Sequence, residues 1–152
     1  MTNINLKIKK LHEDAIIPSI AKHGDAGMDL TAISKGYDDN GNVIYHIGIA
    51  MEIPLGYVGL IFPRSSNSNH NLLLSNSVGV IDSGYRGGIV VKFKKINKAF
   101  GVGESEYYIG DRVAQLVIIE LPTITVTEVN ELSSSERGDG GFGSTGKWKI
   151  II

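Results

Sequence analysis

The residues best suited to chemistry lie in the stretch 76–87, which reads Asn-Ser-Val-Gly-Val-Ile-Asp-Ser-Gly-Tyr-Arg-Gly. Strand-forming residues come before a turn sequence that begins at Asp82, and a second strand pattern resumes at Gly88. We therefore expect a β-hairpin that carries Asp82 near its mouth and Tyr85 just past its turn. Such a hairpin end can read the edge of a small planar ligand with backbone groups while it holds one carboxylate in place. Taken alone, the stretch also fits a surface hairpin whose aspartate only caps the turn.

Length and composition limit the class of protein. A chain of 152 residues is most simply one domain, and its formal net charge of −1 excludes a basic surface for nucleic-acid polymers or anionic membranes. The absence of cysteine excludes disulfides, thiol nucleophiles and cysteine–zinc sites. The chain starts without the apolar core of a signal peptide and contains no apolar run of membrane-spanning length. We expect a soluble cytoplasmic protein with no direct nucleic-acid or membrane partner.

The elements that would position these residues read as short strands separated by turn signals. No segment sustains apolar residues at helical spacing over ten residues, although the polar stretch 64–71 has room for one short helical turn. Asn40-Gly41 is a strong hairpin-turn signal. The expected strands are residues 4–11, 28–32, 43–53, 57–62, 72–74, 78–81, 89–95, 112–121 and 123–129. This pattern is typical of an all-β sandwich, barrel or jelly roll.

The C-terminal residues 133–152 form a glycine- and serine-rich arm that cannot build a core of its own, so residues 1–132 are the expected core domain. Part of the arm, residues 141–147, formally matches both a dinucleotide fingerprint and most of a phosphate-binding P-loop. Both motifs need a following helix, for which too few residues remain, and Trp148 stands where the P-loop needs Ser or Thr. The bared N–H groups of such glycines can still wrap phosphate oxygens, and Phe142 suits a lid that stacks on a flat ring.

Five stretches stand in order along the chain: residues 26–30 (Ala-Gly-Met-Asp-Leu), 63–66 (Pro-Arg-Ser-Ser), 79–87, 110–116 (Gly-Asp-Arg-Val-Ala-Gln-Leu) and 137–146 (Arg-Gly-Asp-Gly-Gly-Phe-Gly-Ser-Thr-Gly). Together they closely resemble the five motifs of the homotrimeric dUTP pyrophosphatases (dUTPases). The resemblance implies a jelly-roll-like (β-clip) single domain that assembles as a homotrimer. It also implies three shared sites: the first, second and fourth motifs come from one chain, the third from another, and the arm from the remaining chain.

The resemblance implies a role for individual residues. Asp82 is the implied group that positions and activates water, Tyr85 packs under the deoxyribose, and Asp29 holds Mg²⁺ through water. Asn76 and the backbone around Gly79 resemble the part that reads uracil. The implied phosphate contacts are Arg64, Ser65, Ser66 and Gln115. The implied closing arm carries Arg137, Phe142, Gly143, Ser144 and Thr145.

The implied activity is hydrolysis of dUTP to dUMP and pyrophosphate by Mg²⁺-assisted attack of water on the α-phosphorus. This reaction limits uracil incorporation into DNA and supplies dUMP for thymidylate synthesis. Guanidinium groups and neutral donors suit a triphosphate independently of the resemblance. A dUTP-sensing binding module of the same fold remains an alternative that is not an enzyme. The related dCTP deaminases are a further alternative, but this chain contains no motif that matches theirs. A purely structural jelly roll would not need Phe142 within a glycine run.

Other residues have structural interpretations. Asp111 and Arg112 are expected to form an ion pair with each other. The histidines lack metal-ligand spacing and are expected on the surface or in loops; they are His12, His23, His46 and His70. Three residues depart from the usual family pattern, namely Ser66, Gly84 and Asp139. The apolar tail 148–152 is expected to dock on a neighbouring subunit and tether the arm.

Overall fold

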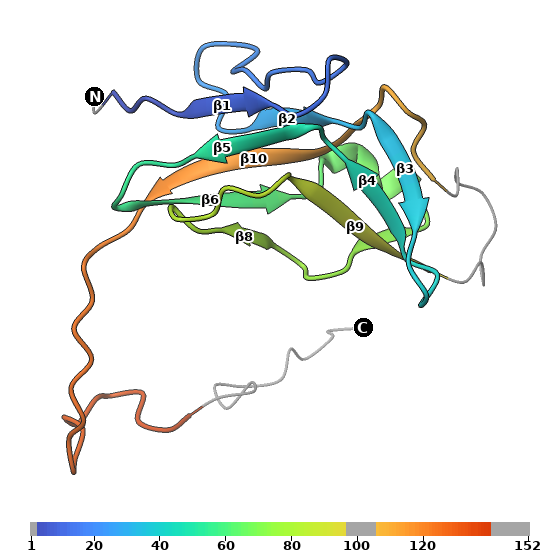
Figure 1. Cartoon of the computed structure of the whole chain (residues 1–152). Coiled ribbons are helices and arrows are strands. Elements are labelled where there is room, and N and C mark those ends of the chain that lie inside the picture. Colours follow the sequence, from blue (N-terminus) through green and yellow to red (C-terminus); the bar gives the residue numbers. More distant parts are fainter. Residues whose placement is uncertain (1–2, 97–105, 141–152) are drawn as a thin grey trace.

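The computed structural model describes residues 3–96 and 106–140, which form ten strands and one 3-10 helix (Figure 1). The strands are β1 (Lys7–Lys10), β2 (Met28–Thr31), β3 (Ser34–Tyr37), β4 (Val43–His46), β5 (Ile49–Glu52), β6 (Tyr57–Phe62), β7 (Leu72–Leu74), β8 (Gly79–Ile81), β9 (Val90–Lys95) and β10 (Arg112–Glu120), and the helix is η1 (Ser65–Asn69). The all-β expectation is confirmed. No helix in this part of the chain is long and apolar enough to cross a bilayer.

Every strand pairing in these residues is antiparallel, and the strands form three sheets. One four-stranded sheet has the order β2-β10-β6-β8, the other has the order β3-β4-β9-β7, and β1 pairs with β5. Apolar side chains from all of these sheets bury one another in a single core. The largest fully buried members include Leu30, Tyr45, Ile49, Phe93 and Leu116. The result is a jelly-roll-like fold.

Several expected elements appear where the residue pattern placed them. The alternation at the N-terminus produces β1, in which Ile8 is half-buried between the exposed Lys7 and Lys9. The Asn40-Gly41 signal closes the β3–β4 hairpin, with Gly41 at a φ of +74°. The polar stretch after β6 forms η1, as expected.

The expected single strand over residues 43–53 is wrong. Gly48 adopts a φ of +73° and breaks the segment into β4 and β5, which join different sheets. A side chain at this position would collide with Ile33 and Ala15, so a glycine is required by both its backbone conformation and its neighbours. The sequence pattern alone could not distinguish a glycine that ends a strand from a glycine inside a continuous strand.

The expected hairpin around Asp82 is also wrong, although its turn is present. Tyr85 N donates to Asp82 O at 3.0 Å, which closes the turn. However, β8 pairs with β6, and β9 pairs with β4 and β7. The segment between β8 and β9 therefore carries the chain from one sheet to the other.

The expected strand over residues 123–129 does not form within the described chain. Residues 121–132 are exposed and run away from the sheets in an extended course (Figure 1). Ile124 is 75% exposed and Val126 is 90% exposed. Strand-forming residues need a neighbouring strand for their backbone groups, and no described residue supplies one here.

Candidate active site

Three adjacent strands bring the first, second and fourth motifs together. In the order β2-β10-β6, Gln115 lies opposite Asp29 on one side and Phe62 on the other. Gln115 Nε2 donates to the carbonyl oxygen of Pro63 at 3.0 Å. Gly27 leaves room for this amide, because a Cβ there would lie 2.6 Å from Gln115 Oε1. The glycine and glutamine of two separate motifs thus fit against each other.

The carboxylate of Asp29 holds two arginines. Its Oδ1 accepts a hydrogen bond from Arg64 Nε at 2.6 Å, and its Oδ2 accepts one from Arg112 Nη1 at 2.9 Å. Arg64 Nη1 also donates to Ser66 Oγ at 3.2 Å. The expected ion pair between Asp111 and Arg112 is therefore wrong. Asp111 instead accepts the backbone N–H of Tyr108 at 2.7 Å.

A polar cavity of about 280 Å³ adjoins this arginine cluster. Its lining residues are Arg64, Ser66, His70, Tyr107, Asp111 and Arg112. Two guanidinium groups and a hydroxyl in one wall form a suitable environment for an anion with several oxygens, because guanidinium forks bind such anions in a bidentate manner. Ser65, the first residue of η1, is exposed beside it.

Two residues of this cavity, His70 and Tyr107, lie outside the five motifs. His70 occupies the loop after η1, as expected, but its Nδ1 is buried and has no hydrogen-bond partner among the described residues. Its ring lies against that of Tyr107, with centroids 3.8 Å apart. Tyr107 belongs to none of the five motifs and is nearly fully buried. The only sequence signal for this role is its residue type, because a tyrosine can bury its ring while its hydroxyl keeps a hydrogen bond.

The third motif lines two adjoining cavities between β8 and β9. The first, of about 270 Å³, is lined by Asn76 and Gly79, and the second, of about 190 Å³, is lined by Asp82 and Tyr85. The two cavities share Val80, Ile81 and Val90 in their walls. They exist because β8 and β9 diverge into different sheets. One apolar slot followed by a smaller chamber suits a flat ring joined to a small substituent.

Backbone groups on one edge of β8 face away from the sheet. β8 is the last strand in its sheet, so its edge beyond β6 has no strand partner among the described residues. Just before it, Ser77 has a φ of +61°, an uncommon conformation for a residue with a side chain, and Val78 N donates to Asn76 O at 2.6 Å. Strained backbone of this kind often occurs at ligand-binding positions.

The turn after β8 is rigid. Arg86 Nη1 donates to the carbonyl oxygens of Ser83 and Tyr85, at 2.6 and 2.9 Å. Tyr85 donates its hydroxyl to Gly88 O at 3.2 Å. Asp82 is exposed on this turn, so its carboxylate is held on a stiff support and remains accessible to solvent.

The third motif runs antiparallel along β6, with Gly79 beside Ile61 and Ile81 beside Gly59. The turn that carries Asp82 therefore lies toward the start of β6, whereas Gly79 lies near the end of that strand, and Arg64 is two residues beyond its last residue, Phe62. The three steps from Gly59 to Phe62 alone span about 10 Å at the usual strand rise. A single chain brings together Asp29, Arg64, Ser66 and Gln115, and it groups Asn76, Gly79, Asp82 and Tyr85 along β8 and its turn. No hydrogen bond and no shared cavity residue joins the two groups within the described residues.

The arm is described only in part. Arg137 lies in an exposed turn, where its Nε donates to Gly140 O at 3.0 Å and Gly138 has a φ of +54°. The remaining arm residues expected at the site lie outside the described residues, namely Phe142, Gly143, Ser144 and Thr145. The tail 148–152 lies outside them as well.

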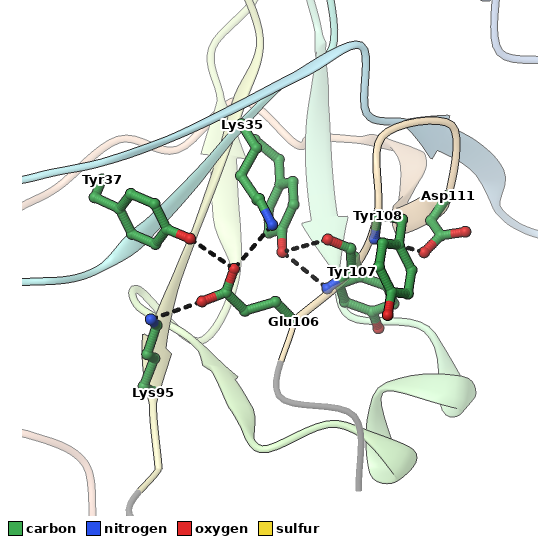
Figure 2. A network of polar contacts seen from close by, with 8 residues as sticks. Lys35, Tyr37, Lys95, Glu106, Tyr107, Tyr108 and Asp111 are labelled. Carbon is green, nitrogen blue, oxygen red and sulfur yellow. Dashed lines mark hydrogen bonds and ion pairs between the residues drawn. The ribbon is translucent and has the colours of Figure 1, made fainter.

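A charged network fixes the segment that carries Tyr107 (Figure 2). Glu106 accepts hydrogen bonds from Lys35 at 3.0 Å and Tyr37 at 2.8 Å, and it forms an ion pair with Lys95 at 2.6 Å. Burial raises the pKa of Glu106, but the hydrogen bonds from Lys95, Lys35 and Tyr37 outweigh it and bring the pKa to about 2. The carboxylate is thus a charged anchor between β3, β9 and the segment leading to β10.

Comparisons with known proteins agree on one family. A sequence profile of the dUTPase family matches residues 13–146. The deoxyuridine 5'-triphosphate nucleotidohydrolase of Clostridioides difficile is 42% identical over 144 residues, which cover 93% of this chain and 98% of the relative. The enzyme of the same name from Nautilia profundicola is 42% identical over 147 residues, which cover 95% of this chain and all of the relative.

Solved structures agree as well. The dUTPase of Staphylococcus bacteriophage 80alpha with dUpNHpp superposes with a TM-score of 0.79 at 29% identity, over 95% of this chain and 100% of that one. A mutant dUTPase from phage phi11 of S. aureus, whose structure reveals the coordination of a structural Mg(II) ion, superposes with a TM-score of 0.70 at 26% identity. That match covers 84% of this chain and 98% of the other.

Proposed function

The chain belongs to the dUTPase family, and we propose that its two residue clusters meet between subunits in one site that hydrolyses dUTP to dUMP and pyrophosphate. The observation that carries this proposal is that the two clusters provide different binding environments. One offers arginines and a polar cavity of about 280 Å³, and the other offers a slot and chamber with a carboxylate at the turn. A nucleoside triphosphate needs both kinds of environment.

The third motif binds the nucleoside. Uracil enters the slot beside Asn76, where backbone groups at the edge of β8 read its polar edge. Cytosine is rejected because its exocyclic amine would leave buried groups unpaired. Tyr85, held by its hydrogen bond to Gly88, packs under the deoxyribose and leaves no room for a 2'-hydroxyl group.

The arginine cluster binds the phosphates. Arg64 is fixed by Asp29 and Ser66, so its guanidinium presents donors in a defined plane. Ser65 and Ser66 add hydroxyl donors near η1, and the amide of Gln115 borders the same region. The arm closes over the phosphates through Arg137, Phe142, Gly143, Ser144 and Thr145.

Asp82 orients the attacking water and accepts its proton. The water oxygen forms a bond to the α-phosphorus while the bond from that phosphorus to the bridging oxygen breaks. The electron pair leaves with pyrophosphate, and dUMP remains. The protein's contribution is positioning and charge stabilisation rather than a covalent intermediate.

The side chains around Asp29 suit Mg²⁺ only when the ion is also bound to the phosphates of the substrate. No group of three described side chains of the kind that binds metals lies close enough together to hold an ion alone. Both oxygens of Asp29 already accept from arginines, although each carboxylate oxygen retains a second lone pair. Asp29 would therefore hold Mg²⁺ through water, while the ion neutralises charge on the phosphates, since Mg²⁺ usually keeps several waters in such sites.

A homotrimer is the assembly that joins the clusters. No hydrogen bond and no shared cavity residue joins the clusters within the described chain, which supports a site that each cluster completes with its counterpart on another chain. The exposed strand-forming segment around Ile124 and Val126 supports the same assembly, because it needs a neighbour to cover it. We place residues 1–132 in the core of each subunit and residues 133–152 in an arm that reaches a neighbouring site.

The activity would limit uracil incorporation into DNA and supply dUMP for thymidylate synthesis in the cytoplasm. Pyrophosphate release from dUTP, dCTP and dTTP tests the proposal directly. We expect release from dUTP alone in the presence of Mg²⁺. Binding of dUTP without any turnover would favour the alternative, a dUTP-sensing module, which does not need a water-activating carboxylate.

A further inference from the structure

His70 lies in the wall of the arginine cavity without a polar partner for its ring among the described residues. The cavity of about 280 Å³ is lined by His70 together with Arg64 and Arg112. The buried side-chain polar atoms that lack a partner in the described chain are His70 Nδ1 and Ser75 Oγ. Nε2 of the histidine makes no hydrogen bond in this part of the chain and yet is not one of those atoms, so this edge of the ring is open.

The ring of His70 is held in place from two sides. Its face lies against that of Tyr107, with the centroids 3.8 Å apart and an angle of 36° between the planes. The backbone N–H of His70 donates to Asn67 O at 3.0 Å, at the end of η1. Tyr107 is anchored in turn, because its phenol donates to Asn67 Oδ1 at 3.1 Å and its backbone N–H donates to the hydroxyl of Tyr45 at 2.9 Å. A ring that is already fixed loses little freedom when a ligand binds to it.

The buried nitrogen decides where the neutral ring carries its proton. A proton on Nδ1 would have no acceptor in the described chain, and an unpaired buried donor is costly. The neutral imidazole therefore carries its proton on Nε2 and leaves a lone pair on Nδ1. His70 thus presents one N–H donor from the wall that also contains Arg64 and Arg112.

The charges around the cavity leave a need for such a donor. Asp29 accepts hydrogen bonds from both arginines, and Asp111 lines the same cavity. Two positive groups are therefore matched by two negative groups, and the surroundings carry no excess of positive charge. An anion with many oxygens then gains from additional neutral donors, and the N–H of an imidazole is a donor of this kind.

We infer that His70 is a binding residue for the β- and γ-phosphates of dUTP, to which it donates a hydrogen bond from Nε2. The inference rests on the proposed function of the site. In that site Asp82 acts at the α-phosphorus, so the part of the substrate that extends into the arginine cavity is the two phosphates beyond it. The inference assigns a ligand to a residue that lies outside the five motifs.

The test replaces His70 in the full chain, in the presence of Mg²⁺. Phenylalanine keeps a ring against Tyr107 but has no nitrogen, glutamine brings an amide near the position of Nε2, and asparagine brings one near the position of Nδ1. Calorimetry would measure the binding of the dUTP analogue dUpNHpp. We expect His70→Phe and His70→Asn to bind it about tenfold more weakly, the usual effect of one hydrogen bond to a charged acceptor. His70→Gln should retain most of the affinity.

The binding of dUMP is the internal control. This nucleotide lacks the β- and γ-phosphates, so its affinity for all three variants should equal that for the unchanged protein. His23→Phe is the matched control variant, because His23 is exposed in the segment before β2. Its affinities for dUpNHpp and dUMP should both equal those of the unchanged protein.

The inference is overturned if His70→Phe binds dUpNHpp normally, if it loses affinity for dUMP to the same extent, or if His70→Gln loses as much as His70→Phe. A fall in the melting temperature with no change in the ratio of the two affinities would also reject it in favour of a structural role. Failure of the proposed function would appear differently, as an unchanged protein that neither binds nor hydrolyses dUTP.

Discussion

Asp29 in β2 pairs with Arg64, which lies two residues beyond the end of β6, across the intervening strand β10. β10 separates β2 from β6, yet Asp29 Oδ1 accepts a 2.6 Å hydrogen bond from Arg64 Nε at the end of this three-strand array. Both side chains are about one-quarter exposed, and the second carboxylate oxygen holds Arg112. The pair is therefore more sheltered than an ordinary surface ion pair, and it sets the orientation of the guanidinium.

Replacing Asp29 by asparagine should weaken substrate binding. The amide keeps the shape of the side chain but removes the charge that Arg64 and Arg112 share, so we expect KM for dUTP to rise about tenfold with a smaller change in kcat. Steady-state pyrophosphate release at saturating Mg²⁺ measures both constants.

Asp39→Asn is the matched control, because Asp39 is exposed. Its KM and kcat should equal those of the unchanged protein. A magnesium titration separates the two roles of Asp29. A KM that returns to normal at high Mg²⁺ would indicate that the carboxylate serves the ion alone and would contradict a role in holding the arginines.

Asp82→Asn should abolish turnover while leaving binding intact. The amide cannot accept a proton from water, so we expect kcat to fall by about three orders of magnitude, within the usual range for loss of a general base. Calorimetry with dUMP should give an affinity close to that of the unchanged protein, because the turn keeps its backbone bonds. Full activity in this variant would remove Asp82 from its assigned role.

Mixing two inactive variants tests whether subunits share sites. In a trimer that contains both Asp82→Asn and Arg64→Ala chains, some sites receive an intact Arg64 from one chain and an intact Asp82 from the other. Random mixing should restore about one-quarter of the normal activity per site, provided that the chains exchange during refolding.

Light scattering on the same samples should give three times the 16.4 kDa mass of one chain. Each variant refolded alone is the control and should remain inactive. Trimeric mixtures without any recovered activity would show that both residues act within one chain.

Glu106→Gln should lower stability in a manner that depends on pH. The pKa of Glu106 is lowered from 4.5 to about 2 in the folded protein, so the charged form contributes stability that is complete above about pH 4.5. That contribution is on the order of 3 kcal/mol and is lost as the pH falls through about 2, the pKa in the folded protein. Thermal unfolding of both proteins should therefore show a difference in Tm near pH 7 that narrows under acid conditions.

Glu128→Gln is the matched control, since Glu128 lies in the exposed extended segment. Its Tm should follow that of the unchanged protein at every pH. A constant Tm difference between Glu106→Gln and the unchanged protein from pH 7 to pH 2 would contradict the role of the charge.

The sequence predicted local structure better than strand partners. Runs such as β6 and β10 follow from their own residues, because alternating and β-branched side chains specify an extended chain. The partner of β8 does not follow from its own residues, because pairing with β6 or β9 depends on which surfaces the whole core buries. Gly48 could not be recognised as a break, since its positive φ is needed only when β4 and β5 enter different sheets.

The candidate site showed the same difference between local features and long-range contacts. The motif residues of the arginine cluster were named correctly as a group that meets, yet their contacts were not: Arg112 turned to Asp29 rather than to Asp111. Tyr107 was missed because its importance comes from its burial and from neighbours far away in the chain, such as Tyr45. Neither property can be read from a local pattern.

The proposed sharing of the site between copies of the chain has a consequence for how the activity depends on protein concentration. Under that proposal, a lone folded copy holds its base-binding residues and its phosphate-binding residues as halves of two different sites. Dilution below the concentration at which copies associate would then silence the protein without unfolding it. In the proposed trimer, one misfolded copy would also remove its residues from every site that it shares.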